Sequence, residues 1–264
     1  MKKILLSLGM IVFVGAVVIG ATGAFFSDTE TSTGNTFTAG AIDLTVDNSC
    51  YYNKVADGNP NCPTSTATTT TWTATNLGAQ HKFFWFDDVK PGDFGEDTIS
   101  LHVDNDAWLR LVIKDVTDFD NSCTEPEEGS VDTCTVSSPE LLTPGAGELR
   151  EALLFSVWLD QGLTPGFQGK YNQTNPLGDP GEGDNIRNHN EPTIISSGTI
   201  DADGETWNLA DAGGLYLIGG QTAYFGIDWT LPGTTGNETQ TDSMSATMEF
   251  QVVQHRNNPT QLGF

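Results

Sequence analysis

Apolar side chains recur at every second position along most of this sequence, and this period limits the possible folds more than any other feature. In a β-strand successive side chains point to opposite faces, so alternation is typical of a strand with one buried face. The alternation is found in residues 41–46, 98–103, 109–114, 154–159, 223–229 and 244–253. Turn residues separate these segments. The pattern therefore predicts a structure built mainly from half-buried β-strands.

Helical periodicity is almost absent. Only residues 147–154 have a plausible helical register, and residues 64–75, nearly all Thr and Ala, fit either a strand or a solvated loop. Two sheets that supply a core from their inner faces satisfy such a set of strands. We therefore expect an all-β fold, an antiparallel β-sandwich with at most one short helix and long acidic loops.

The chain length and the distribution of polar residues favour one folded domain. All-β domains reach 264 residues alone, and a hydrophobic fraction of 37% supports a core. Residues 161–191 are rich in Gly, Pro, Asn and Asp and too polar to form a second core. The predicted organisation is a signal peptide at 1–24, an N-terminal segment at 25–44 and a sandwich domain at 45–264. Its loop inserts are expected at 48–62, 118–138 and 161–191.

The first 24 residues have the layout of a secretory signal. Lys2 and Lys3 precede an uncharged apolar run at 4–20, and small residues follow it. We expect cleavage after Ala24 and a secreted, extracellular or cell-surface product. The alternative is a retained anchor, because the run is at the short limit for crossing a bilayer. The membrane would then be contacted only through the uncleaved signal segment.

The charge balance excludes some classes of partner. The chain has 35 Asp and Glu against 11 Lys and Arg, a net charge of −24. So few basic residues exclude sequence-independent binding to nucleic acid and to anionic membrane surfaces. Self-repulsion of this size loosens a compact state unless salt screens it or divalent cations neutralise it. The composition therefore predicts a halophilic source or a calcium-rich exterior.

The four cysteines agree with export. Cys50 and Cys62 flank one polar loop, and Cys123 and Cys134 flank another. An even number of cysteines in an exported chain predicts disulfides, and proximity favours the pairs 50–62 and 123–134 among three possible connectivities. A zinc site of four cysteines is the alternative, but the C-x-x-C spacing is missing.

Signatures of catalysis are missing. None of the four histidines lies in an H-E-x-x-H motif, and no G-x-S-x-G or phosphate-binding glycine motif is present. His189, in a polar loop, is the best histidine candidate for a metal ligand. We therefore expect no catalytic residues and no certain cofactor.

Calcium is the one cofactor that the sequence suggests. Asp201, Asp203 and Glu205 place oxygen ligands at alternate positions around a glycine, as loops that bind hard cations do. The glutamate that would complete an EF-hand is missing, because residue 212 is Ala. Asp118 and Asp120 form a further acidic pair, and solvated acidic turns are the alternative for each cluster.

Two sequons predict surface glycosylation. They place the acceptor amides at Asn172 and Asn237, and a third candidate at Asn258 fails because proline follows it.

Several motifs together resemble the TasA/camelysin family of exported proteins. The N-terminal pattern consists of residues 24–30 followed by 35–44, and residues 89–93 are similar to the family's L-K-P-G-D turn. Near the C-terminus, residues typical of the family's last hairpin are Trp229, Leu231, Pro232, Gly236, Asn237, Gln240, Ser243, Phe250 and Gln254. The chain departs from the family's bacterial members in its cysteines, its acidity and its insert at 161–191.

The resemblance implies a jelly-roll-like sandwich whose copies form extracellular filaments of the biofilm matrix. Its partners would be other copies of itself, head to tail, and a SipW-type signal peptidase during export. A donated N-terminal strand would complete the sheet of a neighbour. The residues expected to take part are Phe25, Phe26, Thr36, Phe37, Ile42 and Leu44.

Three alternatives remain open. The N-terminal segment can fold back as the first strand of its own domain. The chain can also be a monomeric cell-surface module that binds calcium or glycan. Camelysins are described as metalloproteases, an activity for which the sequence offers no zinc-binding helix.

Overall fold

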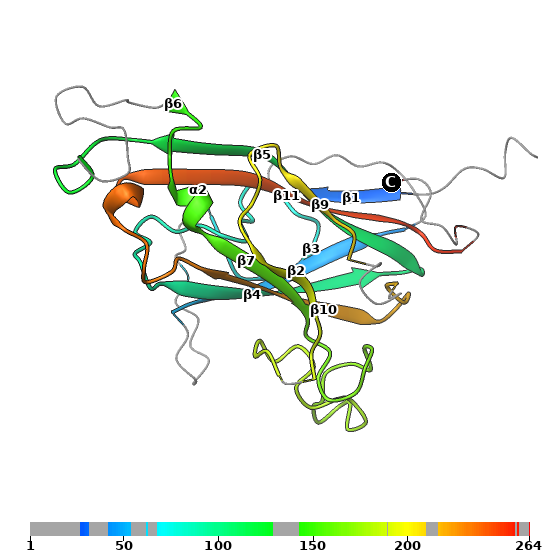
Figure 1. Ribbon diagram of the computed structural model, residues 1–264. Coiled ribbons are helices and arrows are strands. Elements are labelled where there is room, and N and C mark those ends of the chain that lie inside the picture. The colour runs from blue at the N-terminus through cyan, green and yellow to red at the C-terminus, as the bar shows by residue number, and fades with distance from the viewer. Residues whose placement is uncertain are drawn as a thin grey trace, which may run out of the picture.

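The fold consists of two antiparallel sheets packed face to face (Figure 1). The computed structural model describes residues 27–31, 42–53, 62, 68–128, 143–188, 190–209, 216–256, 258 and 264. Sheet A contains β1 (Ser27–Thr31), β11 (Asp242–Gln254), β5 (Ala107–Asp120) and β6 (Thr143–Pro144) in that order, and β9 (Glu205–Trp207) also pairs with β5. Sheet B has the order β3 (Trp72–Thr75), β2 (Leu44–Tyr52), β4 (Phe94–Val103), β10 (Thr222–Thr230), β7 (Leu154–Leu159) and β8 (Thr193–Gly198).

Helical structure is minimal, as the sequence predicts. The described residues contain one α-helical turn, α2 (Leu149–Ala152), inside the only segment with a helical register, and one 3-10 turn, η1 (Asn237–Thr239). The prediction of an antiparallel all-β sandwich with one short helix is therefore confirmed.

The longest ladder of the molecule joins β5 and β11. It runs from Asp242 opposite Asp120 to Gln254 opposite Ala107. A bulge interrupts it between Ser245 and Thr247, where Asp115 of β5 has a positive φ of 52°. A bulge shifts the alternation of a strand by one residue. Buried positions in β5 consequently change from Leu111 and Ile113 before the bulge to Asp118 and Asp120 after it.

The core lies between the inner faces of the two sheets, where the alternating apolar residues meet. Sheet A contributes Leu109, Leu111, Phe250 and Val252, and sheet B contributes Leu44, Val46, Ile99, Leu101, Phe225 and Ile227. These side chains are at most 4% exposed, so most of the hydrophobic stabilisation comes from this layer.

One polar pair interrupts the apolar face of sheet B. Asn48 and Asp97 are fully buried, and the Asn48 amide donates hydrogen bonds to Asp97 Oδ1 at 2.9 Å and to the Thr70 carbonyl at 2.7 Å. Burial raises the pKa of the Asp97 carboxyl well above its usual value, against the opposing effect of the Asn48 hydrogen bond. A neutral carboxyl is therefore the favoured form inside this sandwich.

The turn before β4, which contains Lys90 and Asp93, is fastened to the end of β2. The Asp93 carboxylate accepts hydrogen bonds from the Tyr52 hydroxyl, from the Asn53 amide and from the Lys90 backbone N–H. Gly92 within the turn has a φ of 96°, a conformation that favours glycine. The Lys-Pro-Gly-Asp motif is therefore explained by turn geometry.

Two predicted loop inserts begin inside strands. β2 continues to Tyr52, past the expected boundary at residue 48, and β5 continues to Asp120, past the expected boundary at residue 118. In β2 the alternation of buried positions extends through Asn48 to Cys50. Polar residues at inward positions hid these strand ends from a search for apolar alternation.

The insert at 161–191 projects from the side of sheet B that faces away from sheet A (Figure 1). Four buried carboxylates, instead of apolar side chains, hold it together. Each accepts hydrogen bonds from two backbone N–H groups: Asp160 from Gly183 and Asn185, Asp179 from Leu163 and Thr164, Glu182 from Gln168 and Gly169, and Glu191 from Gly162 and Asn188. Charge-assisted bonds of this kind are about twice as strong as neutral ones.

The packing of Gly226 gives a first prediction. A Cβ atom at Gly226 in β10 would lie 2.0 Å from the indole of Trp158 in the neighbouring β7. We expect Gly226→Ala to lower the free energy of unfolding by about 1–3 kcal/mol, because a well-packed region tolerates an added methyl poorly. Urea unfolding measures the change. Gly198→Ala in β8, where the nearest contact would be 3.9 Å, is the matched control and should change stability by less than about 0.5 kcal/mol.

Asp160 gives a prediction about pH. Burial raises the pKa of the Asp160 carboxyl to about 7, and Glu191 and Asp184 act in the same direction against two backbone hydrogen bonds. In the unfolded chain the pKa of this carboxyl is about 4, so it binds its proton only at lower pH than in the folded protein. The stabilising contribution of proton binding is therefore fully present below about pH 4 and is lost as the pH rises through about 7.

We expect Asp160→Asn to remove this part of the pH dependence. The slope of unfolding free energy against pH between 5 and 8 should be smaller in the variant, measured by urea unfolding in high salt. Asp201→Asn, on an exposed turn, is the control. Equal slopes for Asp160→Asn and the native chain would contradict the assignment.

Candidate functional site

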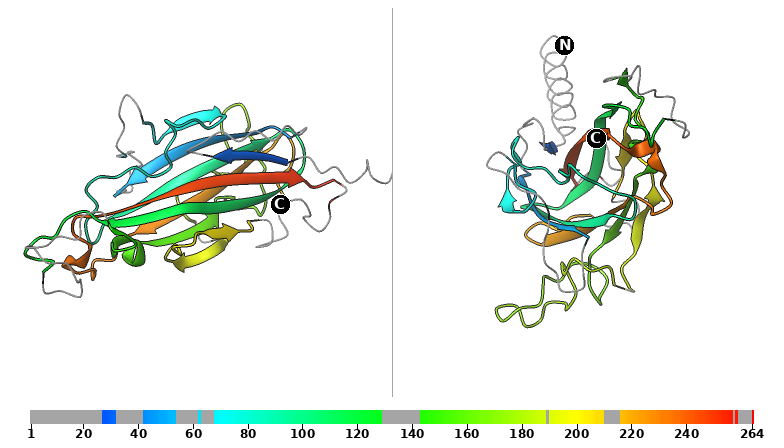
Figure 2. Two further views of the ribbon diagram at one scale, coloured as in Figure 1. Left: turned by 90° about the horizontal axis from the view of Figure 1, so that it is seen from above. Right: turned by 90° about the vertical axis from the view of Figure 1, so that its left-hand side faces the viewer.

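The N-terminal strand lies on the edge of sheet A. β1 pairs antiparallel with β11, with Ser27 opposite Val253 and Thr31 opposite Glu249, and it lies beside β11 in the view from above (Figure 2). β1 is thus an edge strand of its own sheet. Edge strands expose unpaired N–H and C=O groups that can pair with a strand of another chain.

β11 is much longer than the strand that covers it. It has 13 residues, and β1 pairs with five of them, Glu249–Val253. Among the described residues, nothing pairs with the β1 side of β11 between Asp242 and Met248. The same chain begins β2 in sheet B at Leu44, so the intervening residues must cross from one sheet to the other.

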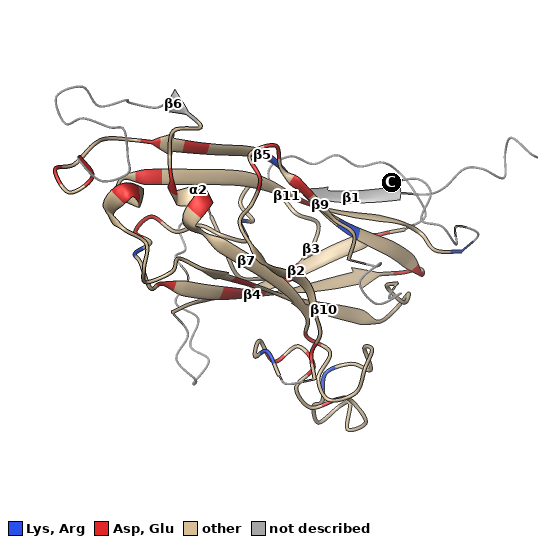
Figure 3. Ribbon diagram, viewed as in Figure 1, with Lys and Arg blue, Asp and Glu red and all other residues tan. Residues whose placement is uncertain are grey.

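A group of carboxylates lies at the opposite end of β11. Asp120 at the end of β5, Glu127 in the following loop and Asp242 at the start of β11 each offer a ligand oxygen, and these atoms lie within 4.8 Å of one another. Asp120 and Glu127 are buried, and Asp242 is half-buried. Figure 3 shows that acidic residues gather at this end of the sandwich, where α2 also lies. These three residues could hold a metal ion.

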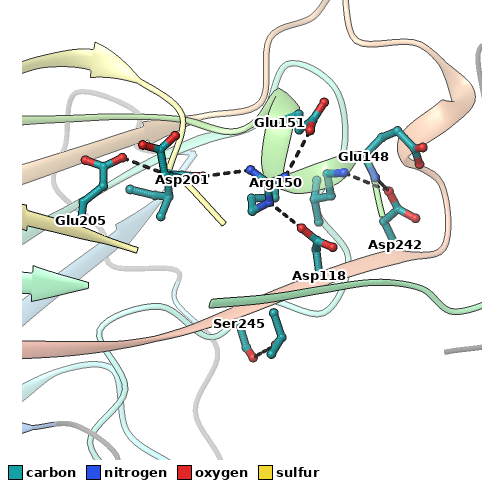
Figure 4. A network of polar contacts seen from close by, with 11 residues as sticks. Asp118, Glu148, Arg150, Glu151, Asp201, Glu205, Asp242 and Ser245 are labelled. Carbon is teal, nitrogen blue, oxygen red and sulfur yellow. Dashed lines mark hydrogen bonds and ion pairs between the residues drawn. The ribbon is translucent and has the colours of Figure 1, made fainter. Parts of the chain in front are cut away.

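Beside this group, Asp118 forms an ion pair with Arg150. The Arg150 guanidinium of α2 donates to the Asp118 carboxylate, and it also contacts Glu151 and the Ile200 carbonyl (Figure 4). The side chains of Asp118 and Arg150 are only 3% and 14% exposed. Hydrogen bonding to Asp118, together with its charge, raises the pKa of Arg150 despite burial.

Asp242 connects the carboxylate group to α2. Its Oδ2 atom accepts hydrogen bonds from the backbone N–H groups of Glu148 at 2.6 Å and Leu149 at 2.9 Å, as Figure 4 shows for Glu148. Burial raises the pKa of the Asp242 carboxyl to about 7; the two hydrogen bonds oppose this, and the Glu148 and Asp120 carboxylates reinforce it.

The sequence-predicted calcium ligands do not converge in the structure. Asp201 and Asp203 lie on an exposed turn, and Glu205 begins β9. The Glu205 carboxylate accepts hydrogen bonds from the Asp201 backbone N–H and from the Trp207 indole. Within the described part of the chain, Asp120, Glu127 and Asp242 are the one group of metal-ligating side chains brought together. Sequence reasoning noted Asp120 but missed Glu127 and Asp242.

One predicted disulfide is confirmed. Cys50 is bonded to Cys62, with their Cα atoms 5.9 Å apart. Cys123 is also in a disulfide, but Cys134 lies outside the described residues, so the 123–134 pairing stays a prediction.

Of the residues predicted to take part in assembly, the structure describes two. Phe25, Phe26, Thr36 and Phe37, together with the cleavage residue Ala24, lie outside the described residues. Ile42 and Leu44 belong to the core of the domain itself, at 3% and 0% exposure. Asn172 and Asn237, the predicted glycosylation sites, are exposed, and His189 is not among the described residues.

Comparison with known proteins supports the family resemblance at the N-terminus. The family described as camelysin metallo-endopeptidase matches residues 1–60. The recognition of the TasA/camelysin family is therefore confirmed over this stretch, which includes β1 and the N-terminal pattern. The motifs at 89–93 and near the C-terminus lie outside the match. No curated protein and no solved structure matches the chain. No helix of the described residues is long and apolar enough to cross a membrane.

The Arg150–Asp118 pair gives a prediction. Arg150→Met leaves a buried carboxylate without its cation and should lower the free energy of unfolding by about 3–5 kcal/mol. The double variant Asp118→Leu with Arg150→Met should recover most of this loss, because both charges are removed. Urea unfolding of both variants measures this recovery of stability. A double variant that is as unstable as Arg150→Met would contradict the prediction.

Proposed function

We propose that this chain is a secreted structural subunit of extracellular filaments, which assemble head to tail when the N-terminal segment of one copy adds to the edge of β11 in the next. The observation that carries the proposal is the pairing of a short N-terminal strand with part of a long edge. A head-to-tail contact that does not close produces a filament.

A donated segment can use more of the edge than the chain's own segment does. Continuing the observed register of β1 would place residues 27–38 opposite residues 253–242. Within one chain, the residues after β1 must also reach β2 in sheet B. A segment from a neighbouring copy has no such restriction and would pair along nearly the whole strand. Each added backbone hydrogen bond contributes about 0.5–1.5 kcal/mol.

The sequence of the segment suits this role. Residues 29–38 are rich in threonine and contain no proline, so each position that faces β11 keeps its backbone N–H. Export would expose the segment: in this proposal a SipW-type signal peptidase cleaves after Ala24, and the mature chain leaves the membrane.

We place the chain with structural proteins rather than peptidases. The match to the camelysin family covers residues 1–60, and this stretch contains no histidine. The carboxylate group of the sandwich contains neither His nor Cys, the ligands preferred by zinc. Oxygen ligands alone favour harder cations.

The test uses the secreted protein and a variant that lacks residues 25–38. We expect filaments of the native protein in electron micrographs, and none of the variant. The variant keeps the β11 edge but cannot donate, so it should bind a synthetic peptide of residues 25–38 and shorten native filaments when the two proteins are mixed.

The same peptide with Thr31 and Thr36 replaced by proline is the matched control, because proline removes backbone donors from the ladder. Filaments of the truncated variant, or equal binding of both peptides, would exclude the donated strand. Monodisperse native protein under all salt conditions would favour a monomeric surface module.

A further inference from the structure

The carboxylate group at the end of sheet A is built from residues of three separate segments. Asp242 and Asp120 are directly opposite partners in the β5–β11 ladder, and Glu127 reaches them from the loop that follows β5. Like charges at directly opposite positions destabilise a sheet. A third carboxylate within 4.8 Å increases that repulsion, which a bound cation would relieve.

Two of the carboxylates are fixed through one oxygen and leave the other available. Asp242 accepts its backbone hydrogen bonds at Oδ2, and Oδ1 is buried without a hydrogen-bond partner in the described structure. Glu127 accepts the Thr124 backbone N–H at Oε2, at 2.6 Å. Both side chains are therefore held in position before any ligand binds.

The second oxygen of Glu127 is the sharpest indication of a ligand. Glu127 is fully buried, and the one described donor near its Oε1 atom is the Thr241 hydroxyl, at 3.4 Å. That hydroxyl has a single hydrogen, which it donates to the Ser122 carbonyl. Among the described residues, the long contact from this hydroxyl is thus all that Oε1 receives, and a buried charged oxygen is costly unless its charge is compensated.

No basic side chain that the structure describes forms an ion pair with Glu127 or Asp242. Arg150, the cation of this end of the sandwich, is engaged with Asp118. The other charged groups close to Asp242 are the carboxylates of Glu148 and Asp120.

We propose that Asp120, Glu127 and Asp242 bind a hard divalent cation of the calcium class. Calcium prefers oxygen ligands at about 2.3–2.6 Å, so two oxygens on the same ion are at most about 5 Å apart, which fits the observed group. The ion would join the loop after β5 to the start of β11. The proposal is independent of filament assembly and replaces the calcium position suggested by the sequence alone.

Titration calorimetry of the whole secreted protein, freed of metal with chelator, tests the site directly. Calcium chloride is the probe, in about 1 M NaCl, where a Debye length of about 3 Å suppresses diffuse binding to the acidic surface. We expect one saturable calcium site in the native protein. Glu127→Gln and Asp242→Asn should weaken binding at least about tenfold, because affinity depends on ligand charge. Asp203→Asn, on an exposed turn, should bind as the native protein does.

Thermal stability separates a ligand role from a merely structural one. In chelator, Glu127→Gln should melt at or above the native temperature, because a buried charge has been removed. In saturating calcium the order should reverse, because only the native protein gains binding energy. Native-like calcium affinity in Glu127→Gln would overturn the proposal. So would an absence of saturable binding to folded native protein, or a Glu127→Gln variant that is less stable than the native chain in chelator.

Discussion

The antiparallel ladder between β5 and β11 is the interaction on which the other features depend. Its inner face carries a large part of the core, its edge carries β1, and its end places Asp120 opposite Asp242. The bulge between Ser245 and Thr247 divides this pair of strands into two parts. On one side of it, inward positions are apolar, and on the other side Asp118 and Asp120 point inward. The ladder therefore connects the edge that pairs with β1 to a polar end.

The excess of acidic over basic residues limits the ways in which the carboxylates of this protein can be stabilised. Carboxylates such as those of Asp201 and Asp203 are exposed to solvent, where salt screens their repulsion. Several buried carboxylates are stabilised in different ways. Asp118 forms an ion pair with Arg150, and the four carboxylates of the insert accept hydrogen bonds from pairs of backbone N–H groups. Asp97 has a raised pKa that favours its neutral form. Backbone donors are useful here because they require no basic residues, of which the chain has only 11. Glu127 and Asp242 also accept backbone N–H groups, but each through one oxygen, and neither forms an ion pair that the structure describes.

The fold could be predicted from the sequence wherever a local pattern determined it. Alternation identified the major strands, the short helical register identified α2, and proximity identified the Cys50–Cys62 disulfide. The carboxylate group could not be found in this way, because Glu127 and Asp242 are more than a hundred residues apart and meet only through strand register. Asp201, Asp203 and Glu205 show the opposite case. They are close in sequence and match a cation-binding spacing, yet the turn directs the Glu205 carboxylate toward the Asp201 backbone and the Trp207 indole.

The two proposed sites share β11, and their positions on it have a physical consequence. Among the described residues, the part of the edge without a pairing strand begins at Asp242, which is also a proposed ligand. A strand end with an unpaired edge is the part of a sheet most prone to local opening. A cation bound by Asp242, Asp120 and Glu127 would hold this end against β5 and against the loop after it. An incoming strand would then meet an edge that is already ordered, and less conformational entropy would be lost when it pairs. Divalent ions could thus favour assembly without touching the donated segment.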